Sequence, residues 1–275
     1  MRSPPDSETV PNPLFSPTFR QPPPDGRTAF ADIAALLTVR GRRAENQDRA
    51  FASLIDRGNG SAAFVACVLD GMGGMRSGGE AAALAAATFL HALSQPSGES
   101  LAHWLVSALT AANAAVWDHL GGNGGAMLTA IAIDDRRQVL CVHVGDSRLY
   151  ARGESIDQVT ADDTVAGLLG ADDSDFISSG LMQFVGMGEG MLHQSFDLSS
   201  RLPATLLLAT DGFHSLSSVP RAEMFDPSEA AFERLAAGLP DDNATAVIVD
   251  VAQAINAAAN HAEGSIRTTS TGGPA

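Results

Sequence analysis

Lysine is absent from this chain of 275 residues, and all 17 of its basic residues are arginine. Several chemistries depend on a lysine amine, among them phosphate binding by a P-loop, ATP anchoring in protein kinases, Schiff-base formation and Ser–Lys hydrolysis. The sequence therefore excludes these chemistries, whatever the reason for the missing lysine.

Cysteine is scarce, with only Cys67 and Cys141 in the chain. Both lie inside apolar, strand-like runs, and neither belongs to a Cys-x-x-Cys pair. Two such residues form no disulfide framework and are typical of small buried side chains in a reducing compartment. The absence of a Cys-x-x-Cys pair also disfavours a structural zinc site.

Positive charge is also in short supply, since the net charge is −15 and the sequence pI is about 4.7. Nucleic acids and anionic membranes both need a basic face, so neither is expected to be the main partner. The first residues show no basic segment followed by an apolar one, and the Ala-rich stretch Glu80–Leu93 is too short to span a bilayer. We therefore expect a soluble, cytoplasmic protein.

One globular domain, residues 29–255, is expected between two disordered tails. Residues 1–28 are rich in Pro, Ser and Thr, and residues 256–275 end in a polar stretch, so neither tail is expected to bury enough apolar surface to fold. The predicted strands are Ala34–Val39, Arg49–Leu54, Ala62–Leu69, Ala126–Asp134, Gln138–Val144, Leu149–Arg152, Thr205–Ala209 and Ala244–Val251. The predicted helices are Gly79–Leu93, Ser100–Leu120 and Pro227–Ala237.

The order of these elements favours an α+β fold over a repeating βαβ sheet, because neighbouring strands are joined by short turns. Arg136 and Arg137 mark the turn of one hairpin, and the Gly-Asp-Ser-Arg sequence at 145–148 is interpreted as the turn of another. Gly121 follows the second helix, where a glycine commonly ends a helix.

Four aspartates stand at the ends of short apolar runs, each beside a Gly or an Asn: Asp70, Asp146, Asp211 and Asp242. Carboxylates at several strand ends can converge, but two of them about 4 Å apart repel by roughly 4 kcal/mol at an effective dielectric of ~20. Hard divalent cations such as Mg²⁺ or Mn²⁺ would offset that repulsion. The pattern predicts a metal site built from carboxylates.

Each of these motifs also has a simpler interpretation, because Asp-Gly and Asp-Asn pairs are common in ordinary turns. The glycine-rich run after Asp70 is no dinucleotide-binding fingerprint, since that spacing requires glycine at position 76, which is Arg76. The Gly145 motif is no nucleophile elbow, because residue 149 is leucine. The glycines do let the backbone come close, so the Gly71 carbonyl could bind a metal ion.

Arg43 and Asp48 bound a polar segment that leads into a predicted strand. The segment could be a solvated loop. Alternatively, Arg43 could bind an oxyanion through its planar fork, and Asp48 could order water around a metal ion. The seven histidines show no spacing typical of metal ligands, so they are expected to be surface or packing residues.

Taken together and in order, six motifs resemble the metal-dependent Ser/Thr protein phosphatases of type 2C (the PPM family), in their compact bacterial form. The motifs are Arg-Ala-Glu-Asn-Gln-Asp at 43–48, Asp-Gly-Met-Gly-Gly at 70–74, a helix pair, Gly-Asp-Ser-Arg at 145–148, Leu-Leu-Leu-Ala-Thr-Asp-Gly at 206–212 and Asp-Asn-Ala-Thr-Ala-Val-Ile-Val at 242–249. The resemblance covers about residues 30–252 and implies an α-β-β-α sandwich, two antiparallel sheets flanked by helical layers.

The resemblance also implies a site with two Mn²⁺ or Mg²⁺ ions and possibly a third. Asp70 would bridge both ions and the Gly71 carbonyl would bind one of them. Asp211 and Asp242 would hold the other ion, and Asp146 would serve a third, weaker ion together with Asp211.

By the same resemblance, Arg43 would bind the substrate phosphate and Asp48 would hydrogen-bond to water at the metals. The implied reaction is hydrolysis of phosphoserine and phosphothreonine in proteins by a metal-activated water. It implies a role in bacterial signalling, with phosphorylated proteins as substrates and a Ser/Thr kinase as the opposing enzyme. Two rival functions are a non-catalytic binding module with the same fold and a hydrolase of small phosphate esters.

The sequence departs from the family pattern at several positions. Gln47 replaces a common Glu, Met72 replaces a His of animal members, and Gly125–Met127 replaces a Gly-Thr-Thr/Ser pattern. The segment 160–183, where the family carries a flap, is short and acidic. None of these changes removes an implied metal ligand.

Overall fold

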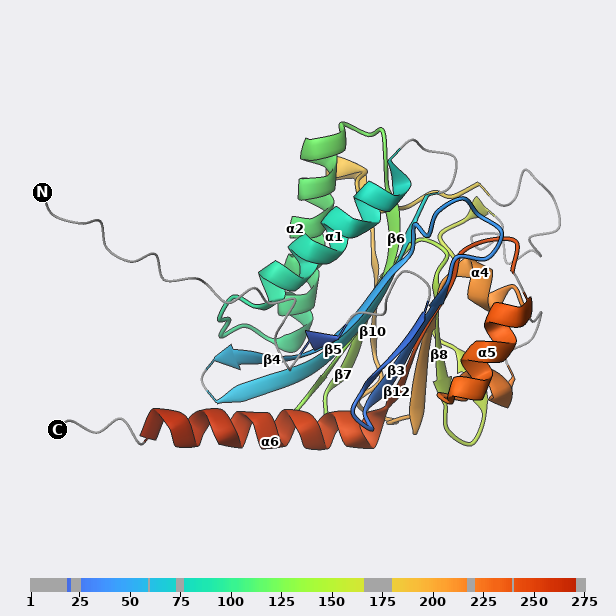
Figure 1. The fold of residues 1–275 in the computed structure, drawn as a ribbon. Coiled ribbons are helices and arrows are strands. Elements are labelled where there is room, and N and C mark those ends of the chain that lie inside the picture. The colour runs from blue at the N-terminus through green and yellow to red at the C-terminus, as the bar shows by residue number, and fades with distance from the viewer. Residues whose placement is uncertain are drawn as a thin grey trace, which may run out of the picture.

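The computed structural model contains two six-stranded sheets that pack face to face between helices (Figure 1). It describes residues 19–20, 26–58, 60–72, 77–165, 180–216, 221–238 and 240–270. All strand neighbours are antiparallel. The first sheet has the order β1 (Phe19–Arg20), β4 (Arg49–Gly58), β5 (Ser61–Gly71), β6 (Ala126–Asp134), β7 (Val139–Val144) and β10 (Gln194–Asp197). The second has the order β2 (Gly26–Phe30), β3 (Ala34–Val39), β12 (Ala244–Asp250), β11 (Thr205–Ala209), β8 (Arg148–Arg152) and β9 (Ile156–Gln158).

Helices cover the outer faces of both sheets. The longer ones are α1 (Gly78–Leu93), α2 (Leu101–Leu120), α5 (Glu229–Gly238) and α6 (Val251–Ser270), and the short ones are η2 (Gly188–Gly190), α4 (Asp211–His214) and η3 (Ala222–Phe225). Helices α1 and α2 pack on the first sheet, whereas α4, η3 and α5 lie over the second (Figure 1). The expected α+β sandwich, with two antiparallel sheets flanked by helical layers, is confirmed.

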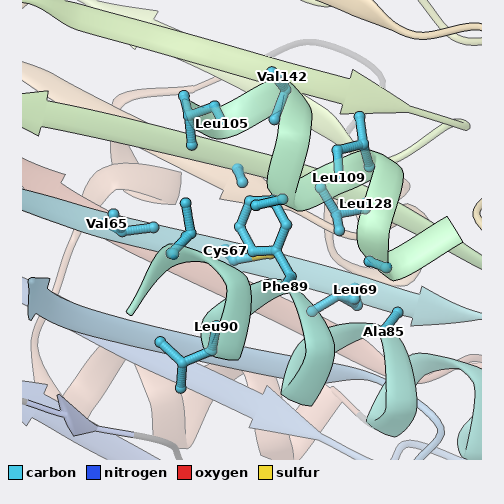
Figure 2. Packing of buried hydrophobic residues seen from close by; sticks show 14 of the residues in the cluster. Val65, Cys67, Leu69, Ala85, Phe89, Leu90, Leu105, Leu109, Leu128 and Val142 are labelled. Carbon is cyan, nitrogen blue, oxygen red and sulfur yellow. The ribbon is translucent and has the colours of Figure 1, made fainter. Parts of the chain in front are cut away.

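The alternation of side chains along β5 explains why the first sheet is apolar on both faces. Val65, Cys67 and Leu69 pack under α1 and α2 (Figure 2), whereas Phe64 and Val68 point into the space between the two sheets. Successive side chains of a strand point to opposite faces, so a strand covered on both sides is apolar throughout. The even-numbered residues of β5, including Asp70, therefore share the face between the sheets.

The ends of α2 follow from its sequence. The Ser100 hydroxyl caps the first turn by accepting a hydrogen bond from the backbone N–H of His103 at 3.2 Å. Gly121 ends the helix with φ of 55°, a left-handed conformation that favours glycine. Both helix boundaries agree with the sequence prediction.

The predicted tails are wrong where they overlap the two ends of the described fold. Strands β1 and β2 begin within residues 1–28, and α6 continues to Ser270, beyond the expected boundary at residue 255. Ala258 and Ala262 in α6 are buried, in line with Val251, Ala254 and Ile255 at helical spacing. The remaining residues of both predicted tails lie outside the described part of the chain.

The Gly145–Arg148 segment is not the turn of a hairpin, contrary to the sequence interpretation. Strand β7 before it belongs to the first sheet, and β8 after it belongs to the second. The segment therefore carries the chain from one sheet to the other, and its residues lie where the two sheets meet. The true hairpin turn at Arg136–Arg137 joins β6 to β7, with Arg137 at φ of 66°.

Both cysteines are buried and free, as expected. Among the described residues, no helix has the length and apolar character needed to cross a membrane.

Candidate metal centre

A cavity of about 440 Å³ opens at one end of the sandwich. Strands β5, β7 and β11 end there, and β4, β8 and β12 begin there, as the strand pairings require. Helix α6 follows the far end of β12 and therefore lies at the opposite end of the sheets (Figure 1). The cavity is lined by Arg43, Ala44, Glu45, Gln47, Asp70, Gly71, Met72, Met127, Asp146, Leu181, Asp211, Asp242 and Asn243.

Asp70 and Asp211 form the centre of the acidic side of this cavity. Asp70 is the penultimate residue of β5, and Asp211 is the first residue of α4, directly after β11. Their side chains share a hydrogen bond. Burial raises the pKa of Asp70 well above its usual value, and the charges of Asp48, Asp211 and Asp146 raise it further. Burial likewise raises the pKa of Asp211.

Asp146 reaches the cavity from the connection between β7 and β8. Burial, followed by the charges of Asp211 and Asp162, raises its pKa to about 7. Its Oδ1 atom is buried, and none of the residues described by the structure forms a hydrogen bond to it. An unsatisfied buried carboxylate oxygen is costly, so it suits a position that receives a cation.

Asp242 lies directly before β12 and pairs with Arg43, whose Nη2 atom is 2.5 Å from its Oδ2. The hydrogen bond to Asp242 is the main cause of the raised pKa of Arg43. The next residue, Asn243, donates from Nδ2 to the carbonyl oxygens of Arg40 (2.8 Å) and Glu45 (3.0 Å). These bonds hold the loop that carries Arg43 against the start of β12.

Asp48 lies beneath the cavity rather than on its wall. Its Oδ2 accepts a hydrogen bond of 2.9 Å from the Thr210 hydroxyl, and no described residue bonds to its buried Oδ1. The Thr210 hydroxyl is in turn fixed by the backbone N–H of Thr245 at 2.9 Å. Burial raises the pKa of Asp48 to about 7.

Two glycines allow the chain segments to approach closely at this end of the fold. A Cβ atom on Gly212 would lie 2.0 Å from the carbonyl oxygen of Asn243, and one on Gly71 would lie 2.5 Å from that of Gly78. Both distances are too short for any side chain. The glycines that follow Asp70 and Asp211 therefore have a packing reason beyond the turn that sequence analysis considered.

Met72, Met127 and Leu181 form an apolar wall beside the carboxylates. Met72 and Met127 are two of the positions where the sequence departs from the family pattern. Gln47, the third, lines the cavity, and its amide Nε2 donates to Glu45 at 2.8 Å. The expected flap lies partly outside the described residues.

Sequence analysis placed Arg43, Asp70, Gly71, Asp146, Asp211 and Asp242 in one site, and all six line this cavity. It missed Thr210, Asn243, His143 and His214, whose hydrogen bonds hold Asp48 and the backbone that carries Arg43 and Asp146. Thr210 and Asn243 carried a sequence signal, because each lies next to an aspartate of a motif. His143 and His214 lie outside the motifs, and a buried histidine there looks like any core residue.

The donor set fits a hard divalent cation, because the acidic side of the cavity presents the carboxylates of Asp70, Asp146, Asp211 and Asp242. Within the described ranges, no three Asp, Glu, His or Cys side chains are already gathered around one point. Mg²⁺ keeps several of its waters and binds proteins through one or two carboxylates. A close pair such as Asp70 and Asp211 is therefore sufficient to hold one such ion. Asp242 is paired with Arg43, and its charge contributes to the raised pKa of Asp211.

The sequence profile of one family, protein phosphatase 2C, matches residues 39–251. Among solved structures, the chain is similar to the serine/threonine phosphatase PstP/Ppp of Mycobacterium tuberculosis, with 26% identity, 79% of this chain and 97% of that chain covered, and a TM-score of 0.61. The PstP catalytic domain solved with two manganese ions is 26% identical, with 79% and 96% covered and a TM-score of 0.60. The phosphatase Stp1 of Staphylococcus aureus shares the fold, with 19% identity, 79% and 94% covered and a TM-score of 0.65. No curated protein matches the sequence.

Proposed function

Because the chain belongs to the protein phosphatase 2C family, we propose that its acidic cavity is where phosphoserine and phosphothreonine in proteins are hydrolysed. The enzyme is a metal-dependent serine/threonine protein phosphatase, in line with bacterial relatives that include a manganese-bound form. The observation that carries the assignment to this cavity is the meeting of four aspartates with Arg43 at one end of the sandwich.

Asp70, the Gly71 carbonyl, Asp211 and Asp242 are the residues that would hold two Mn²⁺ or Mg²⁺ ions, and Asp146 with Asp211 would serve a third. Support comes from the raised pKa values of Asp70 and Asp211, whose buried carboxyls gain from a cation. When bound, such ions acidify water and offset the charge of a phosphate group.

Arg43 would bind the phosphate of the substrate through its planar guanidinium. Its side chain is half exposed and points to the same carboxylate, Asp242, that would take part in metal binding. Binding of a phosphate by Arg43 would leave the Asp242 carboxylate free to hold a metal ion.

Asp48 would orient a water molecule through its unpartnered Oδ1, while Thr210 holds the other oxygen. Placing a carboxylate beneath the site keeps a proton acceptor near the reacting water without exposing it to solvent. The apolar wall of Met72, Met127 and Leu181 would limit the number of competing waters.

Phosphate release from a phosphothreonine peptide, measured with Mn²⁺ and with a chelator, tests this function. We expect activity only with metal, and a loss of at least about 100-fold, or about 2.7 kcal/mol of barrier, in Asp211→Ala. The matched control is Asp226→Ala, which removes a partly exposed carboxylate outside the cavity. Activity that persists in chelator, or in Asp211→Ala, would refute the assignment.

The finer parts of the proposal follow from the class of enzyme. A Ser/Thr kinase would supply the phosphorylated proteins, in a bacterial signalling pathway of the cytoplasm. Magnesium would serve as well as manganese, since both prefer oxygen ligands. Replacing Mn²⁺ by Mg²⁺ in the same assay, and comparing a phosphopeptide with a small phosphate ester, tests these points.

A further inference from the structure

Two consecutive peptide carbonyls in the connection between β7 and β8 face imidazole donors. The Gly145 oxygen lies 3.0 Å from Nε2 of His143, and the Asp146 oxygen lies 3.1 Å from Nε2 of His214. The Thr129 hydroxyl lies 2.9 Å from Nδ1 of His143 and 3.3 Å from the Ser147 oxygen, and its single hydrogen can serve only one of them. We call His143 and His214 the carbonyl clamp.

The clamp and Thr129 come from three separate elements. Thr129 belongs to β6, His143 to β7 and His214 to α4, so the first sheet and a helix over the second sheet hold the connection. His143, Thr129 and Ser147 are 0% exposed and His214 is 8% exposed. The donor side chains are therefore largely shielded from water, which strengthens their hydrogen bonds.

The protonation of the clamp follows from its partners. A carbonyl oxygen only accepts hydrogen bonds, so Nε2 of both histidines carries a hydrogen. Burial lowers the pKa of His143, and burial lowers that of His214 to about 4, so both rings are neutral at pH 7. Nδ1 of His143 then accepts, and the Thr129 hydroxyl lies 2.9 Å from it.

The backbone of the connection is also fixed from the other side. Asp163 accepts a hydrogen bond from the Gly145 N–H at 2.9 Å and donates its own N–H to the Gly145 oxygen at 2.7 Å. By contrast, Oδ1 of Asp146 has no hydrogen-bond partner among the described residues. The place of this carboxylate is therefore set by the backbone rather than by bonds to that oxygen.

We propose that His214 and His143 are positioning residues that fix the Asp146 carboxylate for binding a divalent cation. This inference rests on the proposed function of the cavity. His214 follows Asp211 by three residues, so one short helix carries both an implied ligand and the donor that holds another. Outer hydrogen bonds of this kind usually change metal affinity by 10–100-fold.

Calorimetric titration of the full chain with MnCl₂ tests the proposal. The relevant site is defined as the one whose affinity falls in Asp146→Asn. In His214→Ala we expect its affinity to fall about 10-fold while the tighter sites keep theirs. In His214→Gln, whose amide can still donate, we expect the affinity to stay within about threefold of the original.

His103→Ala is the matched control, because His103 is an exposed histidine of α2 that pairs with Glu99 outside the cavity. Thermal unfolding of each variant reports whether the fold is intact. Should His214→Ala fail to fold, Thr129→Val removes the hydroxyl that contacts His143 at nearly constant volume, and the same loss of affinity is expected.

Unchanged Mn²⁺ affinity in His214→Ala, or an equal loss in His214→Gln, would overturn the positioning role. So would an Asp146→Asn variant that binds Mn²⁺ like the original chain. Failure of the proposed function is a different result, because the original chain would then release no phosphate from a phosphopeptide with Mn²⁺.

Discussion

Asp48 shows how strongly the pKa of one carboxyl group depends on its surroundings. It is 5% exposed, one of its oxygens is bonded to Thr210, and the other has no partner among the described residues. Its ordinary pKa of 3.8 is raised to about 7 by burial. The folded state of the metal-free protein therefore binds a proton here that the unfolded chain has already lost above pH 4.

The sign of this effect predicts the pH dependence of Asp48→Asn. Between pH 4 and 7 the native carboxyl loses its proton only at a cost, so its contribution to stability falls as pH rises. Asparagine does not titrate. We expect the difference in free energy of unfolding between Asp48→Asn and the original chain (variant minus original) to be near zero at pH 4. This difference should become steadily more positive up to pH 7. Urea unfolding of the metal-free proteins measures it, and a flat difference would contradict the raised pKa.

Arg43 is expected to contribute to the use of the substrate rather than to the stability of the fold. Its ion pair with Asp242 is half exposed, and pairs of that kind contribute little to folding. In Arg43→Ala we expect kcat/KM for a phosphopeptide to fall about 10–100-fold, or about 1.4–2.7 kcal/mol, with little change in the unfolding temperature. Arg43→Lys should recover only part of the loss, because an ammonium lacks the planar fork.

Arg42→Ala is the control for Arg43, since Arg42 is a neighbouring exposed arginine that pairs with Asp241. Its kcat/KM should stay within about twofold of the original value, as expected for an exposed pair of little energetic weight. An equal loss in both variants would mean that general positive charge, and not the Arg43 fork, attracts the substrate.

At this scale the sequence reveals ligand types but not their supports. Asp70 and Asp211 stand out because each ends an apolar run and precedes a glycine. The supporting contacts of His214 and Thr210 have no such signal, since their partners Asp146 and Asp48 are far away in sequence. Contacts of that range appear only once the two sheets are packed together.

At the scale of elements, α6 is the largest difference between prediction and structure. Its polar residues suggested a tail, but Ala254, Ile255 and Ala258 form an apolar stripe at helical spacing. Alanine contributes little to hydropathy, so a stripe built mainly from it is easily missed. The stripe packs on the core between the sheets through Val251, Ala254 and Ile255.

Ala258→Asp tests whether this stripe holds the fold. We expect at least about 2 kcal/mol of destabilisation, because a charge and extra volume enter a fully buried position. Asn260→Asp adds the same side chain on the exposed face of the helix and should change stability by less than about 0.5 kcal/mol. Equal effects of the two substitutions in urea unfolding would show that α6 does not pack as described.

The strand assignments show which elements a sequence can reveal. All eight predicted strands exist, because long apolar runs bounded by turn residues have few alternatives. Besides β1 and β2 in the predicted tail, the strands β9 and β10 were missed, since they are only three and four residues long and none of their residues is fully buried. The Gly145 connection was assigned to a hairpin because a short link gives no sign that its two strands belong to different sheets.

At the scale of the whole molecule, the cavity gathers negative charge in a chain whose net charge is already −15. Burial and mutual repulsion both disfavour the ionised carboxylates, as the raised pKa values of Asp70, Asp146 and Asp211 indicate. The site therefore reduces the stability of the metal-free protein at neutral pH. A cation that binds only the folded state reverses the penalty.

Mn²⁺ should accordingly raise the unfolding temperature at pH 7. A free concentration 100 times the dissociation constant adds about 2.7 kcal/mol, which corresponds to about 5–10 °C for a chain of this size. Asp70→Asn should lose most of this shift, whereas Asp157→Asn, a change at an exposed residue outside the cavity, should keep it. Differential scanning calorimetry provides the measurement, and an equal shift in both variants would place the metal elsewhere.

Anomalous diffraction at the manganese absorption edge, from a crystal of the full chain soaked in MnCl₂, most directly tests whether carboxylates from separate strand ends hold metal ions together. The account predicts anomalous peaks at coordinating distance from the carboxylates of Asp70, Asp211 and Asp242, with Arg43 displaced from Asp242. Peaks only at other positions, or none at Mn²⁺ concentrations that support phosphate release, would contradict it.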